Sequence, residues 1–412
     1  MHTRTYSNSD PPITRSVFLD GFTLITARVP SLFVAANLVF AAGSLDDGDL
    51  PGTAHFLEHM LYEGPSRDSV HPYFRKLFQH GARAGAGTNW HDTEYYASGF
   101  VDQTEAIVRA LMRIGFGAPH DFENLERERK VIAQEIILTT GRPGWKYVAW
   151  KNQGLYPAYP ALQIRPAGTL DSLAKITADH LHEFQARFYK PSAAALVVTG
   201  DISHNDVLRL LVAHDVGPRV MPVTRHVAMT PLLGHETYHH SSSVESVTFF
   251  TPVFTQVKER RHGGLLFDLI ADPPYGLLFQ KLRTEEGLVY KMANLVGDWF
   301  MPLYQIEVTA NRAHFDHIEE SLTACLERIA AGNIPDDLWR TVLAARRRFF
   351  AAKPFSSEGT WNNRLTTKWL AGSLHEDDSK GLILGTTRGD ISRLAEKILK
   401  RGRFGRIDIV HE

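Results

Sequence analysis

The sequence has very little cysteine: Cys325 is the one cysteine among 412 residues. A lone cysteine cannot form a disulfide within its own chain, which favours a reducing compartment. No run of about 20 apolar residues is present, and the polar first residues contain no signal-peptide core. These absences predict a cytoplasmic protein that does not associate with membranes.

The sequence also lacks an excess of charge of either sign. Its 45 Lys and Arg residues balance 46 Asp and Glu residues, leaving a formal net charge of −1. This balance argues against nucleic acid or an anionic lipid surface as a partner. The Gly-x-Ser-x-Gly motif of many serine hydrolases is absent as well. With 43% hydrophobic residues, the chain is long enough for two domains with sizeable cores.

What the sequence does contain is His55-Phe-Leu-Glu58-His59. On a helix, His55 and His59 are one turn apart, so both imidazoles project from the same face toward a common point. Glu58 reaches the same side. Two neutral imidazoles can bind Zn²⁺ while an unligated carboxylate accepts a proton from a water on the metal. Two surface histidines on an ordinary helix would give the same pattern, so a third ligand is needed to distinguish a metal site from this alternative.

A candidate third ligand lies in an acidic segment around 122–140, whose apolar residues follow roughly a helical period. Glu128 and Glu135 are seven residues apart and therefore share one helix face. Glu135 follows His59 by 76 residues. With these spacings the chain resembles the pitrilysin or insulinase family (M16) of zinc peptidases. The resemblance implies a zinc ion held by His55, His59 and Glu135, with Glu58 as the base and Glu128 as a supporting catalytic residue.

Two further motifs carry the same resemblance. In Leu282-Arg283-Thr-Glu-Glu-Gly287-Leu-Val-Tyr290, the family likeness implies that Arg283 binds the substrate backbone and that Tyr290 donates a hydrogen bond to the scissile carbonyl. Gly85-Ala86 occupies the substrate-binding edge strand, where relatives usually have Asn-Ala. The glycine therefore departs from the family pattern at a position expected to align substrate.

The family resemblance also implies an α+β fold. We expect two homologous half-domains, each a mixed and mostly antiparallel sheet with helices packed on it. The predicted organisation is a flexible lead-in at 1–14, a zinc-binding domain at 15–215, a Pro-punctuated linker at 216–234 and a second domain carrying the Arg/Tyr motif at 235–412. Between 141 and 168, glycine, proline and aromatic residues predict a loop.

The predicted function is a zinc endopeptidase that cleaves unfolded peptides, or leader and propeptide segments, inside a chamber formed by two chains. Because both motifs lie in one chain, a homodimer is favoured. A heterodimer with another M16-like chain, serving the maturation of a peptide natural product, stays open because Gly85 replaces the usual asparagine. A non-catalytic scaffold is the alternative from another class, although intact ligands and an intact base argue against it.

Overall fold

The structure is a computed structural model of the chain. It describes residues 1–7, 11–63, 72–117, 122–212, 233–241, 244–252, 257–296, 300–301, 303–352, 357–374, 385–402 and 404–411. Two compact units are present: Met1–Ala149 with Tyr159–His226 and Pro354–Asp377, and Trp150–Ala158 with Val227–Lys353 and Asp378–Glu412. The domain bounds expected from the sequence stay a prediction. Apart from Leu233 and Gly234, the expected linker at 216–234 lies outside the described residues.

The first unit is built on a seven-stranded sheet in the order β1-β2-β3-β7-β4-β6-β5. Its strands are β1 (His2–Tyr6), β2 (Ile13–Val17), β3 (Thr23–Arg28), β4 (Phe33–Phe40), β5 (Arg83–Thr88), β6 (Thr93–Phe100) and β7 (Ala194–Gly200). All neighbours pair antiparallel except β3 and β7, which are parallel. β7 is buried along its whole length, as a central strand covered on both faces requires.

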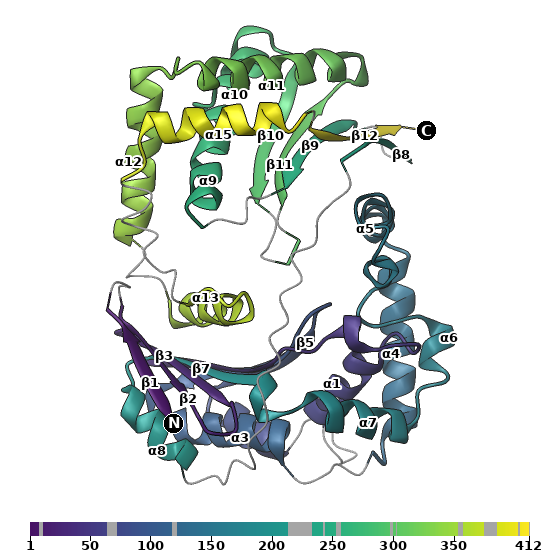
Figure 1. The fold of residues 1–412 in the computed structure, drawn as a ribbon. Coiled ribbons are helices and arrows are strands. Elements are labelled where there is room, and N and C mark those ends of the chain that lie inside the picture. Colours follow the sequence, from purple (N-terminus) through teal and green to yellow (C-terminus); the bar gives the residue numbers. More distant parts are fainter. Residues whose placement is uncertain are drawn as a thin grey trace. The chain divides into compact units, whose positions relative to one another are not determined.

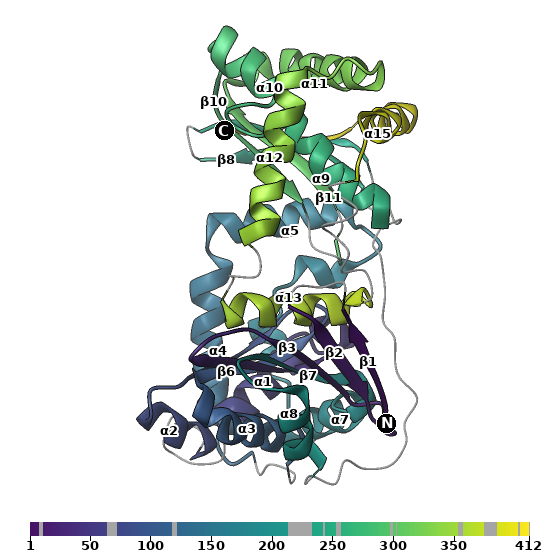
Figure 2. The same cartoon turned by 90° about the vertical axis from the view of Figure 1, so that its left-hand side faces the viewer.

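Helices cover both faces of this sheet. They are α1 (Thr53–Glu63), α2 (Pro72–Gln79), α3 (Thr104–Phe116), α4 (Leu125–Thr140), α6 (Leu170–Leu173), α7 (Ala178–Phe188), α8 (His204–Val212) and α13 (Glu358–Leu370), while α5 (Pro143–Leu155) runs from the first unit into the second. Figures 1 and 2 show α13 on one face and α3 and α8 on the other. Asn362 of α13 is fully buried and donates to the backbone carbonyls of Ala35 and Val197, which fixes this late segment to β4 and β7.

The second unit contains a five-stranded sheet in the order β10-β11-β9-β12-β8. The strands are β8 (His235–His240), β9 (Ser246–Pro252), β10 (Val289–Val296), β11 (Leu303–Ala310) and β12 (Gly405–His411). Its helices are α9 (Val257–Ala271), α10 (Leu277–Phe279), η5 (Gln280–Glu285), α11 (Phe315–Ala330), α12 (Asp336–Ala352) and α15 (Arg388–Lys400). Apolar side chains of α9, α11 and α15 form one core with β9, β10 and β11.

The two sheets share one topology. Strands β3, β7, β4, β6 and β5 of the first unit occur in the same spatial order as β8, β12, β9, β11 and β10 of the second. The first pair of each series is parallel and every other pair is antiparallel. This repetition confirms the predicted α+β class with two homologous halves, each with a mixed and mostly antiparallel sheet.

Two segments differ from the sequence-based expectation. Residues 2–6, expected within a flexible lead-in, form β1. Thr3 and Thr5 lie on one face of this strand, and their hydroxyls contact those of Ser16 and Thr14 on β2 at 2.7 and 3.3 Å. These cross-strand contacts stabilise the pairing of β1 with β2. The loop expected at 141–168 contains α5. Its proline lies at the first helical position, where the missing N–H has no cost.

The start of α1 is fixed by a single carboxylate. Asp47 Oδ2 accepts the backbone N–H of Gly52 at 2.6 Å, and its Oδ1 accepts that of Ala54 at 2.8 Å. N–H groups in a first turn have no partner inside the helix, so this acceptor determines where α1 begins. Gly52 has φ +101°, and a Cβ there would lie 2.7 Å from the carbonyl oxygen of Ala167, so the approach to α1 requires glycine.

Replacing Asp47 with alanine should lower the free energy of unfolding by about 1–2 kcal/mol, because two N–H groups at the start of α1 lose their acceptor. Urea denaturation followed by circular dichroism measures the change. Asp49→Ala removes an exposed carboxylate two residues later and should change stability by less than about 0.5 kcal/mol. Equal losses in both variants would contradict the capping role.

Candidate metal and catalytic site

Helix α1 presents three polar side chains from one buried face. Phe56 and Leu57 are fully buried and anchor the helix in the core of the first unit. His55 is 8% exposed and Glu58 6% exposed, and the two imidazole rings of His55 and His59 have centroids 4.6 Å apart. One nitrogen or oxygen atom from each of these three residues lies within 4.8 Å of the others, close enough to hold one metal ion.

Helix α4 packs against α1 and adds two carboxylates, which the seven-residue spacing places on one face of α4. Glu135 Oε2 is 3.7 Å from His55 Nε2 and 3.6 Å from His59 Nε2. Glu128 Oε2 lies 3.5 Å from His59 Nδ1, on the other side of that ring. Residues far apart in the sequence therefore meet at one point, and Glu128 is placed to orient the imidazole that it contacts.

These distances fit a zinc site. Ligands 2.0–2.1 Å from a tetrahedral metal are separated from each other by about 3.3–3.4 Å, only a few tenths of an ångström less than the observed separations. Glu58 Oε2 lies farther from His55 Nε2, at 4.0 Å, and accepts from the Thr88 hydroxyl at 3.4 Å. Of the two carboxylates, Glu135 is therefore better placed as the third ligand, and Glu58 as an unligated neighbour.

The electrostatics of the cluster also suit a cation. Burial raises the pKa of Glu58 to about 7. Burial lowers the pKa of His59, but its contacts with Glu128 and Glu135 outweigh burial and raise this pKa to about 10. Burial and the neighbouring charge of His59 lower the pKa of His55 to about 4. The carboxylates therefore stabilise a positive charge at this position. A divalent ion bound by neutral imidazoles can supply that charge in place of a protonated histidine.

The edge strand β5 runs beside this cluster. It is the last strand in the sheet order, and Gly85 and Ala86 lie in its middle, opposite Tyr96 and Tyr95 of β6. Thr88, at the end of β5, donates to Glu58. Thr88 could not be singled out from the sequence, since a threonine in a strand carries no functional signal of its own.

Arg283 and Tyr290 lie together in the second unit. The Arg283 guanidinium is 5.9 Å from the centre of the Tyr290 ring, and its Nη1 donates to the carbonyl of Val289 at 2.6 Å. In the register with β11, Val289 pairs with Ala310 and Lys291 with Thr309, so Tyr290 is the extra residue of a β-bulge. A bulge redirects the side chain it carries, and Tyr290 is 78% exposed.

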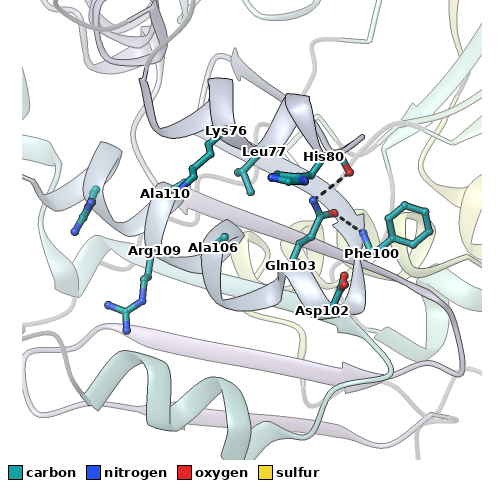
Figure 3. Close-up of a pocket in the computed structure, with 10 residues that line it drawn as sticks. Lys76, Leu77, His80, Phe100, Asp102, Gln103, Ala106, Arg109 and Ala110 are labelled. Carbon is teal, nitrogen blue, oxygen red and sulfur yellow. Dashed lines mark hydrogen bonds between the residues drawn. The ribbon is translucent and has the colours of Figure 1, made fainter.

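A separate surface cavity of about 630 Å³ lies between α2 and α3 (Figure 3). Gln103 closes one side of it by accepting from the backbone N–H of Phe100 at 2.8 Å and donating to the carbonyl of His80 at 3.2 Å. Neither the paired histidines of α1 nor the glutamates of α4 line this cavity. It is therefore distinct from the histidine and glutamate cluster of α1 and α4.

None of the described helices is long and apolar enough to cross a lipid bilayer.

Comparison with known proteins adds names to this geometry. The family model described as Insulinase (Peptidase family M16) matches residues 23–140, and the model described as Peptidase M16 inactive domain matches residues 175–345. The first match includes both α1 and α4. The second includes the Arg283 and Tyr290 motif, in a unit that has no second His-x-x-Glu-His sequence.

Individual relatives agree. An uncharacterized zinc protease of Streptomyces coelicolor is 24% identical over 411 residues, covering 94% of this chain and 88% of the relative. A chloroplastic stromal processing peptidase of Pisum sativum is 25% identical over 205 residues, covering 48% of this chain but only 16% of that much longer protein. A protease from Helicobacter pylori has the same fold, with a TM-score of 0.78 at 15% identity over 98% of this chain and 100% of that one. The chain therefore belongs to the insulinase family of peptidases, M16.

Proposed function

We propose that the chain is a zinc-dependent endopeptidase that cleaves unfolded peptides. The observation that carries the proposal is the position of the Glu135 carboxylate, 3.6–3.7 Å from the Nε2 atoms of both His55 and His59. His55, His59 and Glu135 would hold Zn²⁺. The ion supplies Lewis acidity at the reacting centre and makes water more acidic. Membership of a family whose relatives are named zinc proteases supports the assignment.

Glu58 is the proposed general base. Its carboxylate accepts a proton from the attacking water and later passes that proton to the nitrogen of the broken peptide bond. Burial raises the pKa of the Glu58 carboxyl, which makes the carboxylate a stronger base toward water. The Thr88 hydroxyl orients one of its oxygens. Glu128 keeps the ring of His59 in place.

Substrate contacts are proposed for β5 and for the second unit. The free edge of β5 at Gly85 and Ala86 offers backbone N–H and C=O groups to an extended peptide, which would add one strand to the sheet. Arg283 would hold the peptide backbone. Tyr290 would donate its hydroxyl hydrogen to the scissile carbonyl as that oxygen gains charge. The exposure of Tyr290 on a bulge supports this role, since its side chain is not buried in the core of the second unit.

The pea relative is named a processing peptidase. We extend that kind of reaction to this chain, as the trimming of leader or propeptide segments in the cytoplasm. We also propose that two chains enclose the substrate, because both motifs reside in one polypeptide and a pair of identical chains is then sufficient. A second M16-like chain is the alternative partner.

Glu58→Gln should retain zinc and lose peptide cleavage by about 10²- to 10⁴-fold, because the amide cannot accept the proton. His59→Ala and Glu135→Gln should lose zinc as well, because each removes a ligand. Metal analysis and hydrolysis of an internally quenched, unstructured peptide separate the two classes. Glu123→Gln, an exposed carboxylate just before α4, is the matched control and should behave as wild type. Full cleavage by Glu58→Gln would refute the assigned base.

Tyr290→Phe should lower kcat by about 10²- to 10³-fold with little change in KM, because the lost hydrogen bond forms mainly in the transition state. Steady-state kinetics on the same peptide measure both constants. Tyr275→Phe removes the hydroxyl of another exposed tyrosine of the second unit and should leave both unchanged. A rise in KM alone would show that Tyr290 binds substrate without stabilising the transition state.

The purified chain should have a native mass twice its 46.3 kDa, measured by light scattering during size-exclusion chromatography. Cleavage activity should elute with this dimer. An active species that stays monomeric on dilution would contradict the enclosed two-chain arrangement. An inactive monomer that gains activity with a second M16-like chain would replace the homodimer with a heterodimer.

A further inference from the structure

Strand β6 places different chemistry on its two faces. Thr93, Tyr95 and Ala97 are buried on one face, while Glu94 and Tyr96 alternate with them and point to the other. In the register with β5, Glu94 is directly opposite Gly87 and Tyr96 is directly opposite Gly85. Side chains of directly opposed residues share a face, so the two glycines leave Glu94 and Tyr96 without neighbours on β5.

The two glycines differ in what lies above them. A Cβ built on Gly85 would be 2.4 Å from the Tyr96 hydroxyl oxygen, so the phenol ring covers this position. A Cβ built on Gly87 would meet nothing within 4 Å. The face of β5 is therefore filled at Gly85 and open at Gly87. The open place lies beside Glu94 and one residue before Thr88, which contacts the proposed base.

Glu94 is a carboxyl group without a cationic partner among the described residues. It is half-buried and accepts one hydrogen bond, from the Asn37 side-chain amide at 3.1 Å. Among the described residues no salt bridge is found for Glu94. Burial, together with the neighbouring charge of Asp92, raises the pKa of Glu94 to about 7. A partly buried carboxylate is stabilised by a cationic group on a bound ligand.

The geometry of the edge indicates which ligand group can arrive. A peptide that pairs with the free edge of β5 places the residue opposite Gly87 on the same face as Glu94. Two strand spacings, about 9.5 Å, separate that residue from β6. The bare backbone of Gly87 lies between them, so a long side chain can cross it and meet the carboxylate. Lysine and arginine combine this reach with the required charge.

We propose that Glu94 is a specificity-determining residue that selects a lysine or arginine side chain at the substrate position opposite Gly87, close to the bond that is cut. The open space above Gly87 admits the side chain, Asn37 orients the carboxylate, and Tyr96 limits the space on the Gly85 side. The inference rests on the proposed peptidase function and names its substrate class: extended peptides with a basic residue near the cleavage site.

Quenched peptides that differ at one position at a time test this proposal. Each position carries in turn lysine, its uncharged analogue norleucine, arginine, its uncharged analogue citrulline, or glutamate. At one position near the cleavage site, the zinc-loaded wild type should prefer the cationic residue of each pair by about 10- to 100-fold in kcat/KM, as expected for a charged hydrogen bond. Positions whose side chains point to the other face should show no such preference.

Variants assign the preference to its source. Glu94→Gln should lose the discrimination, because kcat/KM for the lysine peptide falls toward that for the norleucine peptide. A circular dichroism spectrum and a zinc content equal to those of the wild type show that the variant is folded. Glu94→Lys should favour the glutamate peptide instead. Asp102→Asn, which neutralises an exposed carboxylate shortly after β6, is the matched control and should keep the wild-type preference.

The outcomes separate the two proposals. A wild type that cleaves without favouring a basic residue at any position overturns the role of Glu94 and leaves the peptidase function intact. The same holds for Glu94→Gln if it keeps the full preference. A zinc-loaded wild type that cleaves none of the peptides overturns both the specificity and the peptidase function on which it rests.

Discussion

The chemistry of the first unit depends on the packing of α4 against α1, because this contact brings the Glu135 carboxylate within 3.7 Å of both imidazoles. The helices are held together by apolar residues, among them Phe56 of α1 and Ile132 and Ile136 of α4, which are buried in one core. Polar groups can be gathered in this way only if the surrounding packing compensates for burying them, or if an ion neutralises them. The contacts of His59 with Glu128 and Glu135 raise its pKa in spite of burial, so these two carboxylates stabilise a positive charge beside them.

The shared faces of the paired histidines and of the paired glutamates could be predicted from the sequence, because both pairs follow helical periods. The four-residue spacing of His55 and His59 and the seven-residue spacing of Glu128 and Glu135 each fix a shared face, whatever the rest of the chain does. The packing of these two faces against each other is a matter of tertiary structure, and it was inferred from the family resemblance. The role of Thr88 could not be predicted, because its contact with Glu58 depends on how β5 approaches α1.

Other features escaped sequence reasoning for identifiable reasons. α5 was mistaken for a loop because Pro143, Gly144 and Gly154 look like turn residues, although a proline at the first position is compatible with a helix. The association of α13 with the first unit was not foreseen, because amphipathic periodicity shows that a face is buried but not against which sheet. The buried side-chain amide of Asn362 donates hydrogen bonds to backbone carbonyls of β4 and β7, and these bonds attach α13 to the sheet of the first unit.

The repeated topology explains how one fold supplies two kinds of edge. β5 and β10 occupy equivalent ends of their sheets. An edge strand has unpaired backbone N–H and C=O groups that can pair with another chain, so a folded protein either blocks this pairing or uses it for binding. On β5, the Tyr96 side chain of the neighbouring strand covers Gly85, whereas the position of Gly87, opposite Glu94, is open. On β10, a bulge at Tyr290 interrupts the regular ladder and turns a tyrosine outward. The first edge is thus suited to receive another backbone, whereas the second presents a single side chain. Duplication followed by this divergence gives one chain an edge with open backbone at Gly87 and a second edge that carries an exposed tyrosine.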